Sequence, residues 1–226
     1  MLSNNRMSNN QNFGRVLISS IYKRNTRVSV KTEDDYMKQV KKRNTQEHGG
    51  LCEIVGLDEY QVKPYFDVDG KIDFNDDIID NINTDIQKVY NNDIYISKRE
   101  PRIENGVMKY SYRLYLKARI NYKNIPILFK EVFDKYKAID NSVYDPKRIL
   151  FVPLSDRKKN LDVPVLTNIK GSIFDCCATY IQEDYEDLDT LAVKDIEPKN
   201  QSPVDDLLTK INKCYLMTKL QLVNVN

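Results

Sequence analysis

The stretch Tyr65-Phe66-Asp67-Val68-Asp69-Gly70 is the most informative part of this 226-residue sequence. Apolar residues lead into two carboxylates at alternate positions, a pattern typical of a β-strand that ends near solvent. Because the side chains of a strand alternate, both carboxylates project from the same face of a sheet. Two like charges at this spacing repel each other, and a bound divalent cation is the usual remedy. The alternative is a polar strand end that leads into a turn at Gly70.

The patterns on either side of this strand predict an α+β fold with a mostly antiparallel sheet flanked by helices. We expect strands at residues 14–21, 26–31, 51–57, 62–68, 93–98, 107–118 and 148–154, and helices at 33–43, 76–90 and 122–137. A turn at Asn105-Gly106 joins two of the strands into a hairpin.

The composition, with 41% hydrophobic and 30% charged residues, supports a real hydrophobic core. No run approaches the roughly 18 apolar residues that cross a bilayer, and the N-terminus has no apolar signal core, so we expect a soluble intracellular protein without a membrane partner. We expect a disordered polar tail at 1–12, one domain at 13–182, an acidic linker at 183–203 and an amphipathic helix at 204–226.

Charge is segregated along the chain, although the net charge is only +2. Residues 15–43 carry nine Lys/Arg against three Asp/Glu, and residues 98–119 carry seven against two, whereas 182–206 is strongly acidic. Such segregation suits a surface that attracts a polyanion, and clustered solvated charge is the alternative. Four cysteines at no metal or disulfide spacing, with a single histidine, favour packed reduced thiols over a Cys/His metal site.

Two downstream segments carry further candidate residues. The strand around Lys109, Ser111 and Arg113 alternates strictly, so these three side chains share a face. Ammonium, hydroxyl and guanidinium groups in a row suit phosphate oxygens, while a half-buried strand with a polar outer face is the structural alternative. Asp140 lies at a helix–strand junction, where it either supplies a third carboxylate or serves as a turn residue or helix cap.

Together these elements resemble the archaeo-eukaryotic primase superfamily. The ordered set is an Asp-x-Asp strand, a Lys-x-Ser-x-basic strand and the segment Asp140-Asn141-Ser142-Val143-Tyr144 followed by Arg148. The resemblance spans about residues 50–182 and is closest to the primase domains of primase–helicases of nucleocytoplasmic large DNA viruses. It implies a primase/RRM-like catalytic core that synthesises nucleic-acid primers in DNA replication by two-metal nucleotidyl transfer.

The resemblance also implies roles for individual residues. Two Mg²⁺ or Mn²⁺ ions would be held by Asp67, Asp69 and Asp140, and the incoming nucleotide would be bound by Lys109, Ser111, Arg113, Arg148 and Arg157. The implied partners are nucleoside triphosphates, a single-stranded DNA template and a replicative helicase. The implied location for a viral protein is the host cytoplasm or nucleus.

Two positions depart from the family pattern: Arg113 stands where His is usual, and Phe151 stands where a basic residue often occurs. They favour a second hypothesis, a non-catalytic nucleic-acid-binding homologue or replication-accessory protein. A metal-dependent Asp-x-Asp glycosyl- or nucleotidyltransferase is a third. A haloacid-dehalogenase-type phosphatase is disfavoured because Lys71 replaces the Thr of that motif. Without a Gly-x-x-x-x-Gly-Lys-Ser/Thr loop, these residues do not form the ATPase of a helicase.

Overall fold

The computed structural model describes residues 13–20, 23–44, 50–58, 60–70, 76–155, 166–167 and 171–194. The chain divides into two compact units, Met1–Ala192 and Val193–Asn226, and both sheets belong to the first. Helices combine with two sheets in which all described strand pairs are antiparallel, so the predicted α+β class is confirmed. The expected tail at 1–12 and the expected helix at 204–226 lie outside the described residues.

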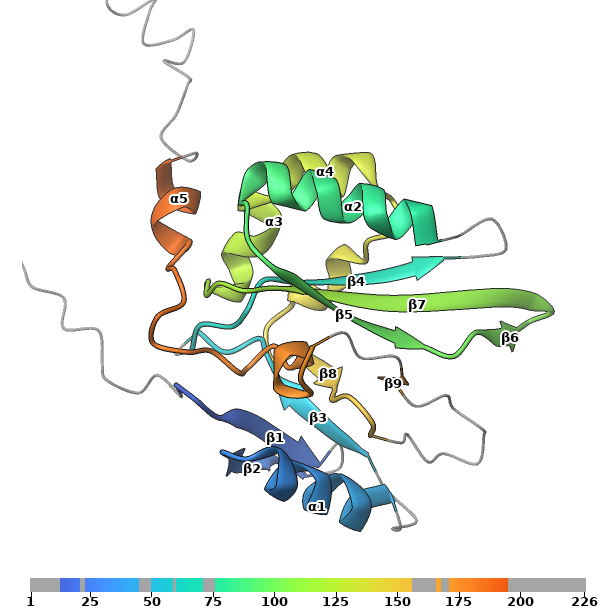
Figure 1. The fold of residues 1–226 in the computed structure, drawn as a ribbon, viewed down its shortest axis with the longest axis vertical. Helices are drawn as coiled ribbons and strands as arrows, with labels where there is room; N and C mark the ends of the chain where they lie inside the picture. Colours follow the sequence, from blue (N-terminus) through green and yellow to red (C-terminus); the bar gives the residue numbers. More distant parts are fainter. Residues whose placement is uncertain are drawn as a thin grey trace, which may run out of the picture. The chain divides into compact units, whose positions relative to one another are not determined.

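The smaller sheet has the strand order β2-β1-β3-β8. Its strands are β1 (Val16–Ser20), β2 (Lys23–Val30), β3 (Leu51–Ile54) and β8 (Ile149–Phe151). Helix α1 (Glu33–Asn44) lies alongside β1 and β2 (Figure 1). Three acidic residues in its first turn and three basic residues in its last complement the helix dipole. Its Tyr36 packs in the core of this sheet and donates a hydrogen bond to the Pro153 carbonyl at 2.6 Å.

The larger sheet has the order β4-β7-β5-β9, with β6 paired to β7. Its strands are β4 (Tyr65–Gly70), β5 (Ile94–Arg99), β6 (Arg102–Glu104), β7 (Val107–Leu116) and β9 (Leu166–Thr167). The expected hairpin turn is present, since Asn105 (φ 54°) and Gly106 (φ 78°) adopt the left-handed conformations that a two-residue hairpin turn requires.

Helices cover one face of the larger sheet (Figure 1). They are α2 (Asp76–Val89), α3 (Ile125–Leu128) and α4 (Lys130–Lys135). The 3₁₀ turn η1 (Tyr122–Asn124) lies directly before α3. The prediction of one continuous helix over 122–137 was wrong. Pro126 occupies the first turn of α3, where its missing N–H is tolerated but the preceding turn cannot continue as α-helix. Phe129, with φ −103° and ψ 26°, then separates α3 from α4.

Two buried charged residues hold the segment 171–181 against the two sheets. Glu53 of β3 accepts hydrogen bonds from the backbone N–H groups of Ala178 (2.9 Å) and Thr179 (2.7 Å). Lys63, just before β4, donates to the carbonyls of Phe174 (2.8 Å) and residue 175 (2.9 Å). Burial raises the pKa of Glu53 and lowers that of Lys63 to about 8. These contacts fix the segment that carries the 3₁₀ turn η3 (Phe174–Cys176).

The first compact unit extends past residue 182, where the composition predicted the start of an acidic linker. Leu188 and Ala192 are buried, and helix α5 spans Asp189–Lys194. The Asp189 carboxylate accepts hydrogen bonds from Asn121 N (2.8 Å) and Asn124 Nδ2 (2.9 Å). Part of this acidic stretch is therefore packed against η1.

Cys52, Cys176 and Cys177 are buried, and Cys214 lies outside the described residues. Within the part of the chain that the structure describes, no helix is both long enough and apolar enough to cross a bilayer.

Candidate functional site

The pairing of β4 with β7 brings the Asp-x-Asp motif beside the basic strand. Asp67 lies opposite Arg113, and Asp69 lies opposite Ser111. Directly opposed residues of an antiparallel pair point to the same face of the sheet. The two carboxylates, the hydroxyl and the guanidinium therefore share one face, the one turned away from helices α2, α3 and α4.

Asp140 joins this face from the other side of β4. An antiparallel bridge links Val68 to Ile139, and the Asp140 N–H donates to the Asp67 carbonyl at 2.8 Å. In this register Asp140 sits opposite Asp67 and points to the same face. Its carboxylate caps the 3₁₀ turn η2 (Asn141–Tyr144) by accepting from Ser142 N at 2.8 Å. The three predicted carboxylates thus meet on one face, although the sequence separates the third from the first two.

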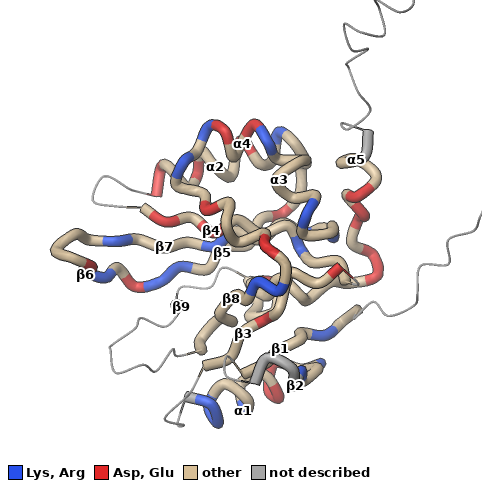
Figure 2. Tube along the Cα trace, turned by 180° about the vertical axis from the view of Figure 1, so that it is seen from behind, with Lys and Arg blue, Asp and Glu red and all other residues tan. Residues whose placement is uncertain are grey.

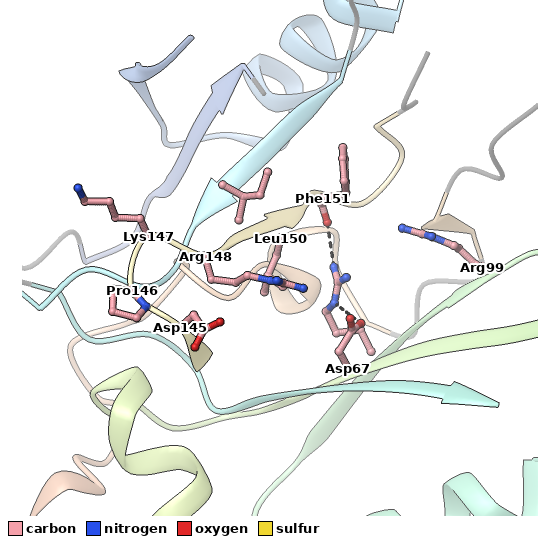
Figure 3. A pocket seen from close by; sticks show the side chains of 10 residues that line it. Asp67, Arg99, Asp145, Pro146, Lys147, Arg148, Leu150 and Phe151 are labelled. Carbon is pink, nitrogen blue, oxygen red and sulfur yellow. Dashed lines mark hydrogen bonds and ion pairs between the residues drawn. The ribbon is translucent and has the colours of Figure 1, made fainter. Parts of the chain in front are cut away.

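An ion pair dominates the centre of this face. Arg113 Nε donates to Asp67 Oδ1 at 3.1 Å, and Arg113 Nη1 donates to the Phe151 carbonyl at 2.9 Å (Figure 3). The side chains of Asp67 and Arg113 are only 17% and 6% exposed. Burial disfavours the charged guanidinium, but attraction to Asp67 outweighs this and raises the pKa of Arg113 above its ordinary value. Arg113 therefore neutralises Asp67 and ties the larger sheet to β8.

A cleft of about 480 Å³ opens beside the ion pair. Its walls come from both sheets and include Asp67, Arg99, Arg113, Arg148 and Phe151. Figure 3 shows Arg148 and Arg99 pointing toward each other from opposite sides of the cleft, and the guanidinium that bonds Asp67 and the Phe151 carbonyl lies between them. The cleft is lined by three arginines and two aspartates, Asp67 and Asp145, and Asp67 is paired with Arg113, so the lining has an excess of positive charge that suits an anionic ligand.

A tight backbone contact positions Arg148. Val55 N donates to the Arg148 carbonyl at 2.9 Å, and Lys147 N donates to the Gly56 carbonyl at 2.7 Å. A Cβ atom on Gly56 would lie 2.3 Å from the Asp145 carbonyl oxygen, so only glycine fits. Lys147 adopts φ 59°, a left-handed conformation that is strained for a non-glycine residue. The loop is thus held in a costly geometry that directs Arg148 into the cleft, while Lys147 points away from it (Figure 3).

Of the predicted site residues in the described ranges, Asp67, Arg113 and Arg148 line the cleft, whereas Asp69, Lys109, Ser111 and Asp140 do not. Lys109 lies near the tip of the β6–β7 hairpin, opposite Arg102, and its ammonium group pairs with Glu104. Arg157 lies outside the described residues. Phe151, identified in the sequence as a departure from the family pattern, contributes its backbone carbonyl to the Arg113 contact.

Sequence reasoning missed Arg99, which lines the cleft from β5. Ser97 pairs with Arg113 across β5 and β7, so Arg99, two residues further on, points to the same face. The sequence does contain a signal, the alternation of Ile94, Ile96 and Lys98 with Ser97 and Arg99. Its use requires the register of β5 against β7, which the hairpin turn alone does not specify.

The carboxylates suit a divalent cation in kind. Hard oxygen donors are the ligands that Mg²⁺ and Mn²⁺ prefer, and all three share a face. As the side chains lie, however, no three His, Cys, Asp or Glu residues in the described ranges are arranged to hold a metal ion. Asp67 is engaged by Arg113 and Asp140 by Ser142, whereas Asp69 is exposed.

No protein-family model matches the chain, and no curated protein matches it in sequence. The case for function therefore rests on the chemistry of this face and its cleft.

Proposed function

We propose that the chain is a primase-type nucleotidyltransferase, which binds a nucleoside triphosphate in the cleft and synthesises primers on a single-stranded DNA template. One observation carries the proposal: Asp67, Asp69 and Asp140 share a single face of the sheet with Ser111 and Arg113. A face that combines acidic and basic groups suits a ligand that itself combines phosphate with a bound cation.

The side chains divide the work by charge. The carboxylates of Asp67, Asp69 and Asp140 would hold Mg²⁺ or Mn²⁺, which supplies positive charge to the phosphate oxygens when bound. Arg148 would bind phosphate oxygens through paired N–H donors, which fix orientation as well as charge. Arg113 would contribute its Nη2 group, because its Nε and Nη1 are engaged by Asp67 and the Phe151 carbonyl. Because Arg113 is buried and anchored to the Phe151 carbonyl, its guanidinium keeps one position and loses little freedom on binding.

The template is expected to follow the basic surfaces. Lys and Arg residues occur along the β5–β6–β7 hairpin and at the end of α1 (Figure 2). The last turn of α1 carries Lys41, Lys42 and Arg43. Positive side chains in rows attract the phosphates of a single strand without reading its sequence.

A non-catalytic nucleic-acid-binding homologue is the second candidate, and the Asp67–Arg113 ion pair favours it. A carboxylate committed to a buried guanidinium is a weaker metal ligand, since binding a cation there would place two positive charges side by side. In this case the cleft binds phosphate groups and no bond is formed.

Incorporation of labelled nucleotides on a primer-free single-stranded DNA template, with Mg²⁺ or Mn²⁺, tests the proposal. The informative variant is Asp69→Asn, because Asp69 is exposed and the substitution leaves the Asp67–Arg113 pair intact. The matched control is Asp80→Asn on the exposed side of α2. We expect product from the wild type and the control, and a loss on the order of 10³-fold in Asp69→Asn.

Binding of Mn²⁺, followed by electron paramagnetic resonance, separates the two candidates. The catalytic proposal predicts Mn²⁺ binding that Asp69→Asn weakens and Asp80→Asn does not. A folded wild type that binds single-stranded DNA, makes no product and binds no Mn²⁺ would support the non-catalytic homologue instead.

A further inference from the structure

We propose that Arg99 completes a three-guanidinium clamp, with Arg113 and Arg148, for the β- and γ-phosphates of the nucleoside triphosphate. This inference rests on the proposed function, because it concerns the same cleft. It is carried by a different residue, one on β5 that lies outside all three motifs of the sequence.

The position of Arg99 follows from strand register. Ser97 lies opposite Arg113, and Lys98 lies opposite Tyr112, so the next residue along β5 returns to the face of Asp67. Arg99 lines the cleft, and its side chain points toward Arg148 across it (Figure 3). The face thus runs from the carboxylates of β4, across Arg113 of β7, to a second guanidinium on β5.

Arg99 also has unused hydrogen-bonding capacity. Its Nε is buried and has no hydrogen-bond partner among the described residues. Buried N–H donors in folded proteins are nearly always paired, so an unpaired one beside a cleft marks a place for an acceptor. A phosphate offers several acceptor oxygens and matches the planar fork of a guanidinium.

The charges around Arg99 favour an anion as well. Burial lowers the pKa of Arg99, and the neighbouring guanidiniums of Arg113 and Arg102 lower it further. Asp67 and Asp69 act in the opposite direction. Asp67 already pairs with Arg113, so the crowded positive charge remains. A polyanion between Arg99 and Arg148 would relieve this repulsion, and with the reacting phosphate at the carboxylates, the terminal phosphates of a triphosphate extend in that direction.

Calorimetric titration with inorganic tripolyphosphate, in EDTA and without template, tests the clamp directly. We expect Arg99→Gln to weaken tripolyphosphate binding on the order of tenfold, because a charged hydrogen-bonding partner is lost. Arg99→Lys keeps the charge but loses the planar fork, so we expect an intermediate affinity. The lysine variant also maintains the test if the glutamine variant fails to fold.

Two controls match this design. Ser97→Ala alters the same face of β5 at a fully buried position, and Lys38→Gln removes one exposed positive charge from α1. Both should bind tripolyphosphate like the wild type. Arg99→Gln should also weaken binding of a nucleoside triphosphate while leaving that of the monophosphate unchanged.

The outcomes separate the clamp from the catalytic proposal. A wild type that makes no primers, but binds tripolyphosphate in a manner dependent on Arg99, would remove the proposed function and retain the clamp. A wild type that makes primers, while folded Arg99→Gln and Arg99→Lys bind tripolyphosphate as tightly as it does, would retain the function and overturn the clamp. Absence of tripolyphosphate binding by the wild type would also overturn the clamp.

Discussion

The two faces of the sheet formed by β4, β7 and β5 share one backbone but differ in character: one is apolar and packs beneath the helices, and the other carries the charged residues of the cleft. Phe66, Val68 and Leu114 point to one face and are buried in the core beneath the helices. Asp67 and Arg113, their neighbours in sequence, point to the other face and line the cleft. Alternate residues of the same strands therefore supply cohesion on one side and chemistry on the other.

The difference explains how a charged site can be rigid. Burying an ion pair such as Asp67–Arg113 costs much of what its attraction returns, so this pair adds little to stability. The apolar face supplies the missing free energy through burial of its side chains. Because the strands are fixed from the apolar side, the side chains of the polar face hold their positions without a ligand.

Phe66→Ala tests the role of the apolar face and should have the largest effect on the free energy of unfolding. The Phe66 ring packs edge-on against Phe129, with centroids 5.1 Å apart, and also contacts Phe133. We expect the free energy of unfolding to fall by about 4 kcal/mol, measured by urea denaturation. Tripolyphosphate affinity per folded molecule should be unchanged. A loss below about 1 kcal/mol would show that this face is not the main source of cohesion.

On the polar face, Asp67→Asn and Asp69→Asn should differ although the residues are two positions apart. Loss of the Asp67 charge leaves Arg113 buried without an ionic partner, so we expect about 3 kcal/mol of destabilisation. Asp69 is exposed, and its substitution should change stability by less than about 0.5 kcal/mol. Adding Arg113→Met to Asp67→Asn should recover stability. Equal losses in the two single variants would contradict the assigned role of the ion pair.

The sequence predicted the polar face better than the contacts across it. Strict alternation identified which residues of β4 and β7 share a face, because that pattern is local. The place of Asp140 beside Asp67 depends on a bridge between Val68 and Ile139, which no local pattern encodes. The link from Arg113 to the Phe151 carbonyl joins two sheets and was equally inaccessible.

Fold prediction failed where tertiary packing overrode periodicity. The apolar stripe over 122–137 is helical in spacing, but Pro126 and the buried Phe129 divide it into the 3₁₀ turn η1 and the two short helices α3 and α4. The acidic stretch after 182 has the composition of a linker, yet Leu188 and Ala192 are buried. Composition describes the average of a segment, whereas one or two apolar residues can decide whether it packs.

Lys63 contrasts with the charged residues of the cleft, because it is a buried charge that holds the segment 171–181 in place and does not line the cleft. It is fully buried, and its ammonium group lies 5.1 Å from the centroid of the Tyr180 ring. Burial lowers its pKa to about 8 from an ordinary value of 10.5. Below pH 8 Lys63 is charged in both the folded and unfolded states, and the cost of burying that charge is fully present. Between pH 8 and 10.5 the unfolded state binds more protons, so stability rises with pH.

We expect Lys63 to contribute a gain of about 2 kcal/mol in the free energy of unfolding between about pH 7 and 9.5. The measurement is the difference in unfolding free energy between wild type and Lys63→Met across this range. Subtraction of the variant removes the titration of other groups. A difference that does not change with pH would mean that Lys63 keeps an ordinary pKa in the folded protein.

The smallest expected effect concerns the loop that carries Arg148 into the cleft. In Gly56→Ala the new methyl group would meet backbone atoms of Asp145, Lys147 and Arg148 at 2.3 to 2.8 Å, so the loop must shift. We expect tripolyphosphate binding to weaken about tenfold, or about 1.4 kcal/mol. Arg148→Gln should cause a similar loss on its own. If Gly56 acts by positioning Arg148, the double variant should bind no more weakly than Arg148→Gln, because sites that act through one contact are not additive. Additive losses would show instead that Gly56→Ala disturbs the cleft by another route, and the polar face would then depend on its loops less than on its strands.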